Sequence, residues 1–95
     1  MQDLKDYLSD NGINPTENFF LSVEDYINFN GKPMAIAYYN ACVERRNLKL
    51  WESGMKPTRN WYVSDVKNYY GIKGNKTKLV SQIEFIRETL FVLLT

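Results

Sequence analysis

Histidine is absent from the 95 residues of this chain, and cysteine occurs once, as Cys42. Histidine is the side chain that most often serves as a general base near neutral pH, and it is the commonest ligand of transition metals. Its absence excludes serine–histidine and cysteine–histidine nucleophilic pairs, and a single cysteine leaves too few ligands for the usual zinc sites. We therefore expect no catalytic residue, no metal and no cofactor, and the sequence predicts a protein that is not an enzyme.

The chain also lacks the features of export and of membrane insertion. One cysteine allows no intrachain disulfide, which favours a reducing compartment, and its neighbours Ala41 and Val43 predict a buried thiol. The N-terminal residues lack the basic start and apolar run of a signal peptide, and no stretch approaches the roughly 20 apolar residues of a membrane span. The expectation is a soluble, cytoplasmic protein with no membrane partner.

What the chain does contain is typical of a folded protein. Hydrophobic residues make up 44% and charged residues 24% of the sequence, which is far from the composition of disorder. A length of 95 residues predicts a single domain covering residues 1–95. Aromatic residues reach 15%, more than a core of this size easily encloses, so we expect some tyrosines at the surface.

Charge is distributed unevenly along the sequence although the net charge is only +1. Residues 1–43 hold two basic and six acidic residues, a net charge of −4, whereas residues 44–95 hold ten basic and five acidic residues, a net charge of +5. This asymmetry allows the second half to face an anionic partner. The alternative is a random scatter of solvated charges.

Apolar periodicity and capping residues predict a mainly α protein, a small bundle of about five helices. The first helix is expected from Gln2 to Ser9, followed by a loop at residues 13–16. Ser22 is expected to cap a second helix that runs to about Asn30 and ends at Gly31. Pro33 suits the first turn of a third helix, which continues to Trp51. Short strands at residues 34–38 and 48–51, forming a wing or hairpin in the middle of the chain, are the alternative.

Two further helices complete the prediction. Thr58 or Ser64 is expected to start the fourth, which stops at Gly71, and Asn75 is expected to cap the last. The last helix shows the clearest periodicity in the chain and is predicted to be the central packing element, through Leu79, Ile83, Ile86, Leu90 and Leu93. Phe85, Phe91, Val92 and Leu94 lie partly off this stripe. Burial of these four is the preferred interpretation, and an apolar surface for a partner is the alternative.

The segment YYGIKGNKTKL, residues 69–79, contains three lysines and no acidic residue. If it connects two helices, lysines gather around a helix N-terminus whose free N–H groups attract phosphate. A nearby tyrosine can add stacking or a phosphate hydrogen bond. The predicted nucleic-acid-binding residues are Lys67, Tyr69, Lys73, Asn75, Lys76, Thr77, Lys78, Ser81 and Gln82.

In residues 60–86, Gly71 stands at the predicted turn, and apolar residues flank it on both sides at positions 66, 70, 72 and 80. This arrangement resembles a helix-turn-helix. Lys67 and Thr77 depart from the motif, which commonly has a small and an apolar residue there. The same region is also similar to the second half of a SAP domain, through Gly74-Asn75-Lys76 and the apolar residues that follow. Both resemblances imply nucleic-acid binding, most naturally to DNA.

Two other interpretations compete with nucleic-acid binding. In the first, the segment is a plain connection between helices with solvated lysines. In the second, the chain is a small protein-interaction module, such as an adaptor or inhibitor, that uses surface tyrosines, Trp51, Trp61 and the apolar C-terminal helix. The same helix would serve a homodimer, the arrangement in which helix-turn-helix proteins often double their contacts.

Overall fold

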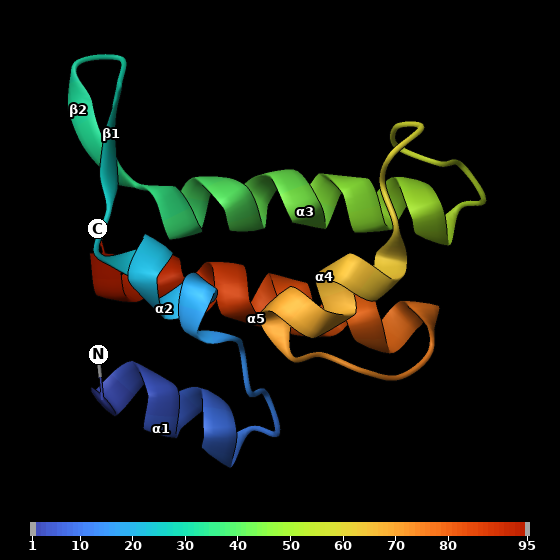
Figure 1. The fold of residues 1–95 in the computed structure, drawn as a ribbon, viewed down its shortest axis with the longest axis horizontal. Helices are drawn as coiled ribbons and strands as arrows, with labels where there is room; N and C mark the ends of the chain where they lie inside the picture. The colour runs from blue at the N-terminus through green and yellow to red at the C-terminus, as the bar shows by residue number, and fades with distance from the viewer. Residues whose placement is uncertain (1, 95) are drawn as a thin grey trace.

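A computed structural model describes residues 2–94. Within this range the chain forms five helices and one hairpin of two short strands, as the mainly α prediction requires (Figure 1). The elements in chain order are α1 (Gln2–Asp10), α2 (Glu17–Val23), β1 (Tyr26–Phe29), β2 (Lys32–Ala35), α3 (Ile36–Glu52), α4 (Val63–Tyr70) and α5 (Lys76–Leu94).

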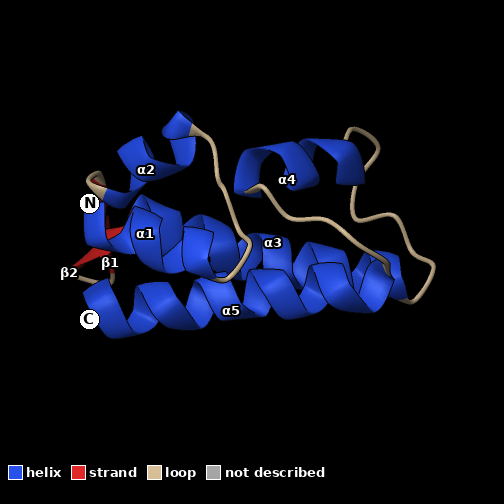
Figure 2. Ribbon diagram, turned by 90° about the horizontal axis from the view of Figure 1, so that it is seen from below, coloured by secondary structure: helices blue, strands red, loops and turns tan. Residues whose placement is uncertain are grey.

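The two longest helices, α3 and α5, run antiparallel and share the most extensive contact in the fold (Figure 1). Figure 2 shows α2 and α4 on the opposite side of the molecule from α5, with α1 alongside the C-terminal half of α5. The core is closed by the four apolar residues of the α5 stripe, each at most 1% exposed: Leu79, Ile83, Ile86 and Leu90. The prediction that the last helix is the central packing element is confirmed.

The apolar stripe of α5 does not stay buried to the end of the helix. Phe91, Val92 and Leu93 are 51%, 77% and 56% exposed, and only Phe85 packs partly against the core. The preferred interpretation of burial is therefore wrong for Phe91 and Val92, and the stripe ends before Leu93. The first turn of α1 lies beside the last turn of α5, where Asp3 and Leu4 line a groove with Val92 and Leu93, but it does not cover these side chains. The side chain of Leu94 lies outside the described side chains.

An ion cluster joins α3 to α5 beside the core. The Glu84 carboxylate accepts hydrogen bonds from Arg45 on α3 and from Arg87 one turn further along α5. These bonds, the one from Arg87 first, hold the pKa of Glu84 below its ordinary value despite partial desolvation. The cluster fixes the rotation of α5 against α3.

The predicted helix from Ser22 to Asn30 is wrong. Ser22 lies inside α2, where its hydroxyl donates to the carbonyl of Phe19 (2.6 Å), and residues 26–29 form strand β1. Asn30 and Gly31 both have positive φ, 53° and 80°, as a two-residue type I′ turn requires. The Asn-Gly pair was a hairpin signal that the sequence interpretation took for a helix end.

The predicted helix start at Pro33 is also wrong. Pro33 lies in β2, paired with Asn28 across the hairpin, and α3 begins three residues later at Ile36. A two-stranded hairpin has only edge strands, and these tolerate a residue without an N–H. The alternative of a hairpin in the middle of the chain is thus correct in kind but not in position, because residues 36–38 and 48–51 are helical.

The remaining sequence signals have mixed outcomes. The first helix and the loop at residues 13–16 are confirmed, and Gly71 ends α4 in the left-handed conformation (φ 64°) as predicted. Neither Thr58 nor Ser64 caps α4, because Tyr62 occupies that position. Cys42 is half-buried rather than fully buried. Among residues 2–94, no helix combines the length and apolar character needed to cross a membrane.

Candidate functional site

The turn between α4 and α5, residues 71–75, is built by backbone geometry and by two amide side chains. Gly71 and Gly74 have positive φ, 64° and 121°. The Asn75 side-chain oxygen accepts the N–H of Lys78 (2.9 Å), so Asn75 caps α5 as predicted. Gln82 reaches back along the helix, and its Nε2 donates to the carbonyls of Lys73 (2.6 Å) and Lys78 (2.9 Å). The turn is therefore held rigidly at the start of α5.

The lysines around this turn face solvent. Lys67, Lys73, Lys76 and Lys78 are all exposed. Within residues 2–94, none of these four lysines forms an ion pair within 4.0 Å. Residues 49–78 hold seven basic and two acidic residues, a local charge of +5. A rigid turn with several unneutralised ammonium groups on it and beside it attracts anions. We refer to residues 71–78 as the basic turn.

The polar residues at the start of α5 are also available. Thr77 and Ser81 are exposed, on the same stretch of helix as Lys78. The backbone N–H groups of Lys76 and Thr77 have no hydrogen-bond acceptor among residues 2–94, because α5 begins there and the Asn75 cap takes only the later donors. The first turn of α5 thus presents hydroxyls, ammonium groups and free N–H groups together.

Tyr69 has different surroundings from the lysines. Its ring is half-buried and meets Phe19 and Tyr70 edge-on, and its hydroxyl lies 3.4 Å from both the Asn18 carbonyl and the Ser22 hydroxyl. These contacts direct Tyr69 toward α2. The structure therefore assigns Tyr69 a packing role between α4 and α2, as it assigns Gln82 a role within the turn.

A hollow of about 390 Å³ lies beside the start of α5 and was missed in the sequence. It is lined by Trp51, Gly54, Met55, Lys56, Trp61, Tyr62, Val63 and Lys76. The ammonium nitrogen of Lys76 lies 5.0 Å from the centre of the Trp51 ring, and that of Lys56 lies 4.5 Å from the centre of Tyr62. The hollow thus joins the C-terminal end of α3 and the loop at residues 53–62 to the basic turn.

The signal for this hollow was present in the sequence. Between Trp51 and Trp61 stand Lys56 and Arg59, with Tyr62 directly after them. Aromatic and basic residues interleaved in one loop are typical of nucleic-acid surfaces. The sequence interpretation placed Trp51 at the end of the third helix and assigned both tryptophans only to protein contact. Only the fold brings the loop against Lys76, which lies more than ten residues further along the chain.

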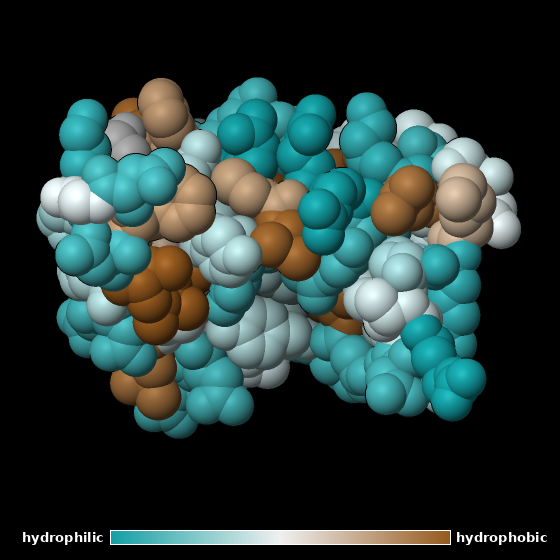
Figure 3. Space-filling view, turned by 90° about the horizontal axis from the view of Figure 1, so that it is seen from above, coloured by the Kyte–Doolittle hydropathy of each residue, from teal (hydrophilic) through white to brown (hydrophobic). Residues whose placement is uncertain are grey.

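The basic and acidic parts of the sequence occupy different ends of the fold. The loop at residues 53–62 and the start of α5 lie at one end, whereas α2, the hairpin, the start of α1 and the end of α5 lie at the other (Figure 1). On the face shown in Figure 3, strongly apolar atoms gather mainly toward the hairpin end, and the opposite end is mostly hydrophilic or pale. Most of the basic residues of the segment 49–78 therefore lie at the end of the fold away from the hairpin.

Among residues 2–94, no group of three or more cysteine, aspartate and glutamate side chains is placed to hold a metal ion. No protein-family model, curated protein or solved structure matches this chain.

Proposed function

We propose that this protein binds nucleic acid without catalysis, through the basic turn and the aromatic hollow beside it. The observation that carries the proposal is the contact of Lys76 with Trp51, which places an ammonium group of the turn at the mouth of a hollow lined by two tryptophans and a tyrosine. Phosphates are bound by cationic groups and bases by aromatic rings, and a nucleic-acid site needs the two kinds of group close together.

The turn would hold the nucleic-acid backbone. Lys73, Lys76 and Lys78 are exposed and have no carboxylate partner in the described part of the chain, residues 2–94. Each is able to neutralise a phosphate and release its counterion. The free N–H groups at the start of α5 add directed hydrogen bonds to phosphate oxygen. Asn75 and Gln82 would keep the turn in place, while Lys67, on the last turn of α4, would add charge to its edge.

The aromatic hollow would hold bases. Tyr62 is 55% exposed and Trp51 and Trp61 are half-buried, so each ring keeps some surface that a ligand can reach. A base offers its face only when it is outside a duplex stack, so the hollow favours single-stranded over intact duplex nucleic acid. The helix-turn-helix resemblance favours the opposite, a duplex groove contacted by Thr77 and Ser81. We expect the nucleic acid to be DNA. A comparison of single-stranded with duplex DNA distinguishes base stacking in the hollow from groove contact by Thr77 and Ser81.

The test is a fluorescence titration of the protein with labelled single-stranded DNA, duplex DNA and RNA at several salt concentrations. We expect salt-dependent binding, tightest for single-stranded DNA. Replacing Lys73, Lys76 and Lys78 by Ala should weaken binding and reduce the slope of log K against log salt by about 0.7 to 0.9 for each phosphate that is no longer neutralised.

A matched control variant replaces Lys5, Lys32 and Arg46 by Ala. These three basic residues are exposed and lie in α1, β2 and α3, so their removal changes the net charge by the same amount. The control should keep the salt slope. Equal reductions of affinity in the two variants, or no binding by the unmodified protein at low salt, would remove the proposal.

We also propose a cytoplasmic location. An oxidising compartment stabilises proteins that form disulfides, and the single cysteine of this chain allows no intrachain disulfide. Labelling of Cys42 in intact cells by a thiol reagent would show a reduced thiol, whereas a mixed disulfide would contradict the assignment.

A further inference from the structure

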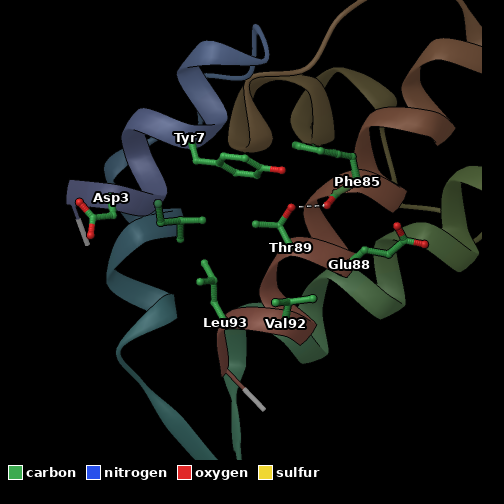
Figure 4. Close-up of a pocket in the computed structure, with 8 residues that line it drawn as sticks. Asp3, Tyr7, Phe85, Glu88, Thr89, Val92 and Leu93 are labelled. Carbon is green, nitrogen blue, oxygen red and sulfur yellow. Dashed lines mark hydrogen bonds between the residues drawn. The ribbon is translucent and has the colours of Figure 1, made fainter.

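A groove of about 470 Å³ lies between α1 and the C-terminal half of α5, away from the basic turn (Figure 4). It is lined by Asp3, Leu4, Tyr7, Phe85, Glu88, Thr89, Val92 and Leu93. Its open side is formed by the last turn of α5, where Val92 and Leu93 stay exposed beside Asp3 and Leu4 of α1. The groove takes no part in the nucleic-acid proposal.

The floor of the groove is apolar. The rings of Tyr7 and Phe85 stack with centres 5.6 Å apart, and the Thr89 hydroxyl donates to the Phe85 carbonyl (2.8 Å), as the dashed line in Figure 4 shows. That bond occupies the Thr89 donor and leaves its methyl group for contact. Val92 and Leu93 are 77% and 56% exposed. An apolar surface rimmed by polar groups is typical of an interaction site.

The rim of the groove is acidic. Figure 4 shows Asp3 and Glu88 on opposite sides of the apolar residues, one on α1 and one on α5. No basic residue is among those that line the groove. Arg87, the neighbour of Glu88 in sequence, is bound to the Glu84 carboxylate. An occupant of this groove therefore needs apolar groups at its centre and positive charge at its edges.

The dimensions of the groove suit a helix. The α5 segment from Phe85 to Leu93 is nine residues long, which corresponds to about 13.5 Å at 1.5 Å per residue. A partner helix of two to three turns covers this length with apolar residues at positions i, i+3 or i+4, and i+7.

We propose that this groove binds a basic amphipathic helix of a partner protein, with leucine-like side chains between Tyr7 and Val92 and lysine or arginine beside Asp3 and Glu88. A second copy of this chain fits less well. Two-fold pairing through the same groove would bring Asp3 and Glu88 of each copy close to those of the other, and like charges in an interface repel. The same carboxylates disfavour an anionic lipid surface.

The probe is a fluorescein-labelled peptide of leucine and lysine, about 14 residues long because shorter isolated helices are marginal in water. Its leucines occupy one helical face. A second peptide replaces every lysine by glutamate and keeps the leucines. In anisotropy titrations we expect the lysine peptide to bind the full chain at least about tenfold more tightly than the glutamate peptide.

Two variants locate the binding. Val92→Asp should abolish binding of the lysine peptide, whereas Leu21→Asp, at a leucine that is 56% exposed on α2, should not. Asp3→Asn combined with Glu88→Lys leaves the apolar floor intact and should remove or reverse the preference for lysine. The salt slope for binding of labelled single-stranded DNA should be the same in all three variants and in the unmodified protein, which separates this proposal from the preceding one.

Three results would overturn the proposal. They are equal binding of the two peptides, no binding of the lysine peptide, and a preference for lysine that survives the charge-altering variant. Sedimentation, which measures the oligomeric state, is an independent test. A dimer that dissociates on Val92→Asp would mean that a second copy occupies the groove, and a monomer in both proteins is the expected result.

Discussion

Gly71 lies against the backbone of Asn14, so close that a Cβ built on Gly71 would come within 2.0 Å of the Asn14 carbonyl oxygen. The same two residues are joined by a weak backbone hydrogen bond from the N–H of Asn14 to the carbonyl of Gly71 (3.5 Å). Thr16 adds a second link, because its N–H donates to the carbonyl of Tyr69 (3.1 Å). The loop after α1 is thereby attached to the end of α4, where the basic turn begins.

Gly71→Ala should be strongly destabilising. The substitution has two costs. Alanine is strained in the left-handed conformation of Gly71, and its Cβ would clash with backbone atoms, which move less easily than a side chain. We expect the free energy of unfolding, measured by chemical denaturation, to fall by about 3 kcal/mol or more.

Gly12→Ala is the matched control for Gly71→Ala. Gly12 has a similar φ of 76°, but a Cβ on it would meet no atom within 4 Å. Its substitution should therefore cost only the left-handed strain, about 1 to 2 kcal/mol. Equal destabilisation at the two glycines would mean that the loop at residues 13–16 moves away from α4 without cost.

Asn75→Ala should weaken the start of α5. The substitution removes the acceptor for the Lys78 N–H, and we expect a decrease of about 1 kcal/mol in the free energy of unfolding. Asn75→Asp keeps an acceptor at the same position and should retain most of the stability. If the alanine and aspartate variants were equally unstable, the cap would contribute nothing and the side-chain amide would matter for another reason.

The helices that sequence analysis located well are those whose ends are marked by local chemistry. Gly71 and Asn75 mark the end of α4 and the start of α5 because left-handed φ and capping depend only on nearby residues. The stripe from Leu79 to Leu90 was equally clear, since a fully buried helix face needs an unbroken period. These signals are local, and they were sufficient for the mainly α class.

The errors arose where one signal has two meanings or where burial depends on distant elements. An Asn-Gly pair is compatible with a helix end and with a type I′ turn. Asn30-Gly31 forms the turn because the flanking residues pair as strands, Tyr26 with Ala35. Exposure of Val92 depends on how α1 packs beside the end of α5, which no periodicity within α5 contains. The aromatic hollow was missed for the same reason, because Lys76 and Trp51 meet only in the folded chain.

Glu84→Gln should destabilise the packing of α3 against α5 and change the acid dependence of stability. The substitution leaves Arg45 and Arg87 without their shared carboxylate, and we expect a decrease of about 1 kcal/mol in the free energy of unfolding at neutral pH for this partly exposed cluster. Glu88→Gln, at an exposed carboxylate on the same helix that lies outside these ion pairs, should cost little.

The sign of the pH effect follows from the lowered pKa of Glu84. In the unfolded chain this carboxyl titrates near its ordinary pKa of 4.5, and in the folded protein it titrates lower. Its contribution is therefore fully present above about pH 4.5 and is lost as the pH falls through the folded pKa. Denaturation curves between neutral and acidic pH should converge for the unmodified protein and Glu84→Gln. Curves that stay parallel would contradict the assignment.

Tyr62→Ala should separate base stacking from charge in the proposed nucleic-acid site. The side chain is 55% exposed and lies under the Lys56 ammonium group, so its removal should leave the fold intact and take away one stacking face. We expect binding of labelled single-stranded DNA to weaken by about 1 to 3 kcal/mol with the salt slope unchanged, because every phosphate keeps its lysine. Tyr62→Phe keeps the ring and should bind nearly as well as the unmodified protein.

Tyr26→Ala is the matched control, since Tyr26 is 56% exposed on the hairpin at the opposite end of the molecule. Equal affinity of the Tyr62 and Tyr26 alanine variants would restrict the site to the lysines of the turn and remove the hollow from it.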